Sequence, residues 1–160
     1  MTDPSWTEEL LRANAAYADQ FSLGDLEARA TRGVAVVTCM DTRIEPLGML
    51  GLVPGDAKIM RNAGGRVTDD VLRSLVLAAH MLGVERIVVI HHTECALAGA
   101  TDDELRAATG PGSDDWWFGA MPDPDEALAD DVQRVRDCPL LPENVVVEGL
   151  VYDVRTGRLR

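Results

Sequence analysis

The stretch RIVVIHHTEC, residues 86–95, decides how this chain is organised. Its four consecutive apolar residues, 87–90, are typical of a strand that is covered on both faces of a parallel sheet. Two histidines and a cysteine follow within five positions, although the whole chain has only three His and three Cys. We therefore expect a buried strand whose end carries the chemistry of the protein.

The segments around this strand predict an alternation of strands and helices. GVAVVTC, residues 33–39, is another short β-branched run, and AKIMRN, residues 57–62, is a weaker one. Residues 68–82 have acids in the first turn and apolar residues at helical spacing, and residues 144–160 predict a strand, a turn and a short return strand. The pattern predicts an α/β fold with a mainly parallel central β-sheet flanked by helices.

With 160 residues the chain has the length of one domain, so we expect residues 1–160 to form a single unit. Within it, residues 1–24 predict an N-terminal helical arm, because apolar residues recur every three or four positions from Trp6 to Phe21. This stripe packs either on its own domain or on a partner subunit. Residues 100–142 are mostly helical and polar, and a Gly- and Pro-rich loop interrupts them.

Charge and composition exclude several classes of partner. Fifteen basic against twenty-seven acidic residues give a net charge of −12, which repels nucleic acid phosphates and anionic membrane surfaces. No apolar run approaches the length of a membrane span, and MTDPSWTEEL lacks the features of a secretory signal, so we expect a cytoplasmic protein. Acidic pairs such as Asp130–Asp131 are expected to be solvated.

Three residues form a candidate zinc site. Cys39 and His92 lie at the carboxyl ends of two predicted strands, where parallel sheets bind ligands, and Cys95 follows His92 by three residues. Thiolate and imidazole are ligands that Zn²⁺ favours, and three protein ligands with an open position are typical of a catalytic site. The alternatives are that Cys39 is a buried apolar residue, or that Cys138 completes a closed structural site.

Asp41 and Arg43 follow Cys39 directly and are two residues apart, so both side chains can point the same way from an extended loop. Arg43 would hold the Asp41 carboxylate by a charge-assisted hydrogen bond. The other carboxylate oxygen would remain free to orient a zinc-bound hydroxide.

Four motifs together resemble the β-class carbonic anhydrases, particularly their short, cab-type branch. They are CMDTR (39–43), GDAKIMRNAGG (55–65), HTEC (92–95) and GLVYDVRTGRL (149–159). The resemblance implies that Cys39, His92 and Cys95 hold zinc and that Asp41 and Arg43 form the catalytic dyad. It also implies an obligate homodimer with an exchanged N-terminal helix, often assembled into a higher homo-oligomer.

The expected function is the zinc-dependent interconversion of CO2 and bicarbonate. A bound Zn²⁺ lowers the pKa of its water and makes hydroxide available as a nucleophile. Two thiolates cancel the charge of the metal, so activity should rise into the alkaline range. The sequence departs from the family pattern at Ala96–Leu97, after the last ligand, and at Lys58, which replaces a common His. Ala96 and Leu97 leave open a carbonyl sulfide or carbon disulfide hydrolase on the same scaffold. A non-catalytic zinc-binding module is an alternative from another class.

Other residues near the motifs have two interpretations each. Strand alternation sends His91 to the opposite side from His92, which favours a hydrogen-bonded structural histidine over a proton shuttle. Gly64 and Gly65 form either an anion cradle or a plain turn. The aromatic run 116–118 lines a lid or an interface, or anchors its own loop.

Overall fold

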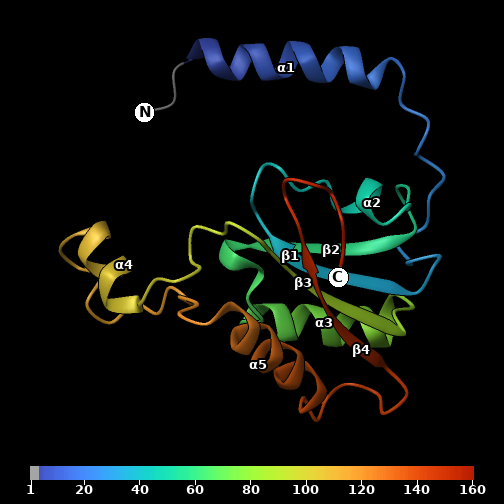
Figure 1. Ribbon diagram of the computed structural model, residues 1–160. Coiled ribbons are helices and arrows are strands. Elements are labelled where there is room, and N and C mark those ends of the chain that lie inside the picture. The colour runs from blue at the N-terminus through green and yellow to red at the C-terminus, as the bar shows by residue number, and fades with distance from the viewer. Residues whose placement is uncertain (1–3) are drawn as a thin grey trace.

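The computed structural model describes residues 4–160 and contains one four-stranded parallel sheet of order β2-β1-β3-β4 (Figure 1). The strands are β1 (Val34–Cys39), β2 (Ala57–Asn62), β3 (Arg86–His92) and β4 (Val146–Tyr152). The predicted α/β fold with a parallel central sheet is confirmed. Residues 1–3 of the predicted arm lie outside the described residues.

Helices α3 (Asp69–Met81) and α5 (Pro124–Arg136) cover one face of the sheet (Figure 1). Their N-termini are capped by side chains, with Thr68 accepting from the amide of Val71 and Asp123 accepting from the amides of residues 125 and 126. Apolar residues of both helices pack on β1 and β3, and Leu75, Val89 and Val135 are fully buried there. The predicted helix 68–82 is confirmed to within a residue at each end.

Strand β1 is buried on both faces, which explains its unbroken apolar run. Val37 faces α3 and α5, whereas Val36 and Thr38 face the other side. The buried Thr38 hydroxyl donates to the carbonyl of Ile90 over 2.9 Å, so even the polar residue of the strand is satisfied within the sheet.

The second face of the sheet is only partly covered, by the short helix α2 (Pro46–Met49). It carries an apolar groove of about 320 Å³, lined by Val34, Leu50, Leu52, Arg86, Ile87, Val88, Val146, Glu148 and Leu150. Helix α1 (Pro4–Ala18) stands apart from the sheet in Figure 1, and residues 5–18 are all exposed. In residues 4–160 no helix is long and apolar enough to cross a membrane.

Two peripheral segments complete the chain. Helix α4 (Asp102–Thr109) begins with a capping box of Thr101 and Glu104, and it projects from the body of the protein (Figure 1). The predicted C-terminal turn forms around Gly157, whose φ is +70°. The predicted return strand is reduced to one antiparallel bridge between Tyr152 and Leu159, because the turn itself occupies residues 153–158.

Candidate active site

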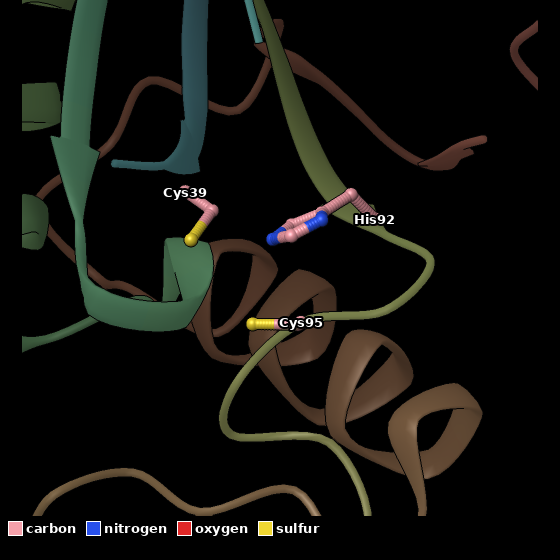
Figure 2. A group of neighbouring side chains, drawn as sticks. All are labelled: Cys39, His92 and Cys95. Atoms are coloured by element: carbon pink, nitrogen blue, oxygen red, sulfur yellow. The ribbon is translucent and has the colours of Figure 1, made fainter. Parts of the chain in front are cut away.

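Strand order places the candidate metal ligands in one crevice. The chain leaves β1 for β2 on one side and leaves β3 for β4 on the other, so the connections that follow the two central strands diverge at their carboxyl ends. Cys39 ends β1, His92 ends β3, and Cys95 lies in the turn that follows. Figure 2 shows their side chains converging, and the three ligand atoms lie within 4.8 Å of one another.

The donor set fits a metal ion. Cys39, His92 and Cys95 are 5%, 4% and 7% exposed. Nδ1 of His92 lies 2.9 Å from the carbonyl oxygen of Thr93, and because a carbonyl only accepts, Nδ1 carries the proton. Nε2 is buried, and no described residue partners it in hydrogen-bond geometry. A buried ring nitrogen without a partner beside two sulfurs is costly unless it binds a cation.

The two cysteines influence each other's ionisation. The hydrogen bond between them lowers the pKa of Cys39 to about 4, despite the opposing effect of burial. The same bond, together with burial, raises the pKa of Cys95 well above its ordinary value. The environment thus favours ionisation of Cys39, and the thiolate is the form of cysteine that binds a metal ion.

Asp41 and Arg43 form a two-pronged ion pair at the mouth of the crevice. Nε of Arg43 donates to Oδ1 over 3.0 Å and Nη2 donates to Oδ2 over 2.8 Å, while the Arg43 amide also donates to Oδ1. The expectation that one carboxylate oxygen stays free of Arg43 is therefore wrong, because the planar guanidinium engages both. Oδ2 accepts only one of these bonds and lies 4.0 Å from Nε2 of His92, so it retains a lone pair beside the cluster.

The ion pair also sets the charge of the dyad. The hydrogen bond from Arg43 holds the pKa of Asp41 well below its usual range, and Asp41 raises the pKa of Arg43. Asp41 is consequently a permanent carboxylate, suited to accept a hydrogen bond but not to store a proton.

Two residues shape the backbone around Cys39: Arg61, whose role the sequence did not reveal, and Gly65, for which it left two interpretations. Arg61 donates from Nε to the carbonyl of Cys39 over 3.0 Å and from Nη2 to the carbonyl of Asp41 over 2.7 Å. Gly65, in the 3₁₀ turn η1 (Ala63–Gly65), has φ +68°, and a Cβ there would lie 2.9 Å from the amide nitrogen of Cys39. The turn thus needs this glycine for close packing, without reference to an anion.

A buried polar network lies behind the ligands. Asp131 accepts from Nε of Arg66 over 2.6 Å and lies 3.1 Å from Nε2 of His91. The prediction that His91 is a hydrogen-bonded histidine pointing away from His92 is confirmed. The expectation that Asp131 is solvated is wrong, because the side chain is only 3% exposed and is matched by the Arg66 charge.

The remaining candidates lie outside the cluster. Cys138 is a free thiol in the loop after α5 and is not among the residues that gather around His92 in the described part of the chain. Trp116 and Trp117 are more than half exposed, and the guanidinium of Arg66 lies 5.6 Å from the Trp117 ring. Trp117 therefore connects the projecting loop to the network behind the site.

Comparison with known proteins agrees with this geometry. Residues 34–117, just over half of the chain, match a family model described as carbonic anhydrase. β-Carbonic anhydrase 1 of Mycobacterium tuberculosis is 35% identical over 156 residues, covering 96% of this chain and 95% of the relative. A carbon disulfide hydrolase of Acidithiobacillus thiooxidans is 36% identical over 152 residues, covering 81% of this chain and 76% of that protein.

Solved structures show the same relationship. The crystal structure of a carbonic anhydrase from Streptococcus mutans superimposes with a TM-score of 0.87 at 40% identity, covering 99% of this chain and 98% of that one. With the family model, the near full-length relatives and the shared fold in agreement, the chain belongs to the β-carbonic anhydrase family.

Proposed function

We propose that this protein is a zinc enzyme that reversibly hydrates CO2 to bicarbonate and a proton. The observation that carries the proposal is the buried cluster of Cys39, His92 and Cys95, with the unpaired Nε2 of His92 beside the Asp41 carboxylate. We further propose that the enzyme works in the cytoplasm, where reducing conditions keep its free cysteines available as ligands.

Each residue of the site has a role that its contacts support. Cys39, His92 and Cys95 would hold Zn²⁺, and the hydrogen bond to Thr93 would fix the tautomer of His92. When bound, the ion supplies the Lewis acidity that makes a water-derived nucleophile available near neutral pH. Oδ2 of Asp41 would accept a hydrogen bond from the attacking water and so orient it toward CO2. Arg43 keeps Asp41 ionised and oriented.

The direct test is stopped-flow CO2 hydration from pH 7 to 9 on protein of measured zinc content. We expect turnover that rises with pH, because two thiolate ligands make the water that becomes the nucleophile less acidic. One zinc per chain without hydration at any pH would reject the carbonic anhydrase and favour either a hydrolase of sulfur substrates or the non-catalytic zinc-binding module.

A carbon disulfide or carbonyl sulfide hydrolase is the second candidate, supported by the carbon disulfide hydrolase that is 36% identical over 81% of this chain. Leu97 packs on the ligand cluster, next to Ala96, where it would contact a larger or more apolar substrate. Sulfide release from carbon disulfide, measured beside CO2 hydration on the same preparation, separates the two. Sulfide production with negligible CO2 turnover would reverse our assignment.

We also propose that residues 1–160 form one domain whose arm, residues 1–24, packs on a partner subunit in a homodimer or higher homo-oligomer. The exposed apolar residues of α1, including Trp6, Leu10 and Tyr17, support this, as does the open apolar groove on the sheet of about 320 Å³. Sedimentation velocity of the Leu10→Asp variant should show a shift to monomer. The control is Leu140→Asp, which changes another exposed leucine, in the loop after α5.

A further inference from the structure

The acidic residue immediately before the third ligand contacts the same Arg43 guanidinium that binds Asp41. Glu94 has φ +57° and is the only non-glycine with positive φ in residues 4–160. Its backbone carbonyl accepts from Nη2 of Arg43 over 3.2 Å, and its Oε2 accepts from Nη1 over 3.2 Å. The left-handed backbone therefore lets both the main chain and the side chain of one residue face the same guanidinium.

A second arginine holds the other side of Glu94. Nε of Arg155 donates to Oε1 of Glu94. Arg155 lies in the C-terminal turn, where Oδ1 of Asp153 accepts from the amides of Arg155 and Thr156 over 2.8 and 3.1 Å. The result is a chain of alternating charges, Arg155–Glu94–Arg43–Asp41, that runs from this turn to the candidate active site.

The connections matter because Asp41 and Arg43 belong to one short loop after β1. The loop follows Cys39 directly and Arg61 holds its backbone, but neither the ion pair nor Arg61 joins the Arg43 side chain to the segment that carries His92 and Cys95. Glu94 does, because it is bonded covalently to Cys95 and spans to Arg43 across the crevice. An error of a fraction of an ångström in the position of a catalytic group is enough to slow turnover.

We propose that Glu94 is a positioning residue for the hydration reaction, which holds Arg43 and through it Asp41 at a fixed place relative to the metal ligands, and that Arg155 anchors Glu94. The proposal rests on the proposed function. It assigns a role in turnover to a residue of the C-terminal turn, which lies far from the ligands in the sequence.

The contacts predict a modest, salt-dependent effect. The side chains of Arg43 and Glu94 are 42% and 41% exposed, so salt and water screen their attraction. We expect Glu94→Gln to lower kcat about fivefold at low ionic strength, and Arg155→Ala about twofold, with unchanged zinc content. Arg158→Ala, which removes an exposed arginine of the same C-terminal segment, is the matched control and should behave as wild type.

Glu94→Gly separates positioning from stability. Glycine adopts positive φ without strain, so this variant should unfold at a Tm no lower than that of the wild type, yet it lacks the carboxylate and should lose kcat as Glu94→Gln does. If Glu94 had a structural role alone, the Tm and the kcat of the variant would fall together.

Salt provides the decisive readout. The ratio of wild-type to Glu94→Gln kcat should fall toward one as ionic strength rises from about 0.02 to 0.5 M, since screening removes the advantage of the charge. Inhibition by the added anion affects both proteins and cancels in the ratio. If the wild type is active and both Glu94→Gln and Glu94→Gly have the same kcat as the wild type at low salt, the positioning role is overturned. Loss of zinc in either variant would also overturn it. Absence of wild-type turnover would instead reject the proposed function.

Discussion

Replacing Asp131 by Asn tests whether the network behind the ligands stabilises the folded protein. The carboxylate accepts hydrogen bonds from Nε of Arg66 and from the amide of Val67, and it faces His91. Asn has nearly the same shape but no charge. The Arg66 guanidinium, with 11% of its side chain exposed, would then lose its charged partner and keep only neutral ones, among them the carbonyls of Gly119 and Ala120.

The expected cost follows from this burial. Removing one member of a buried ion pair costs about 3–5 kcal/mol, because the remaining charge is desolvated without compensation. For a chain of this length we expect the Tm of Asp131→Asn to fall by roughly 10 °C. The double variant Arg66→Met with Asp131→Leu removes both charges and should recover most of the loss.

The pH dependence gives an independent check. Burial raises the pKa of Asp131, but the hydrogen bonds from His91 and Arg66 outweigh it and leave the pKa below its ordinary value. A depressed carboxyl pKa adds stability that is present above the unfolded pKa of about 3.9 and is lost as the pH falls through the folded pKa. The difference between wild type and Asp131→Asn in urea unfolding should therefore shrink below about pH 4. A difference under about 1 kcal/mol at pH 7 would refute the reasoning.

Three further substitutions test the candidate site. Cys39→Ser should lose most of the zinc, measured by metal analysis, because a hydroxyl is a poor replacement for a thiolate; full zinc content would contradict its role as a ligand. Asp41→Asn should keep zinc but lower kcat about a hundredfold in stopped-flow hydration, and full activity would reject its orienting role. Cys138→Ala should keep both zinc and activity, since the thiol lies outside the cluster; loss of zinc would favour a closed four-ligand site.

Local signals in the sequence were sufficient for the fold and for the candidate ligands. Unbroken β-branched runs predicted β1 and β3, and strand ends in a parallel sheet share one edge, so Cys39 and His92 had to meet there. The spacing of Cys95 from His92 follows from the same turn. These predictions depend on periodicity and short-range spacing, and both can be read directly from the order of the residues.

The partners of charged residues depended on the tertiary structure. In the sequence, Asp131 resembles any surface acid of a helix. It contacts Arg66 and His91 only because α5 packs on β3. Glu94 and Arg155 are 61 residues apart, and only the pairing of β3 with β4 places their side chains together. Residue types and local periodicity thus determined the strands, the helices and the ligand set. Long-range packing decided which charges are buried and paired, because a salt bridge depends on distance in space and leaves no periodic pattern in the sequence.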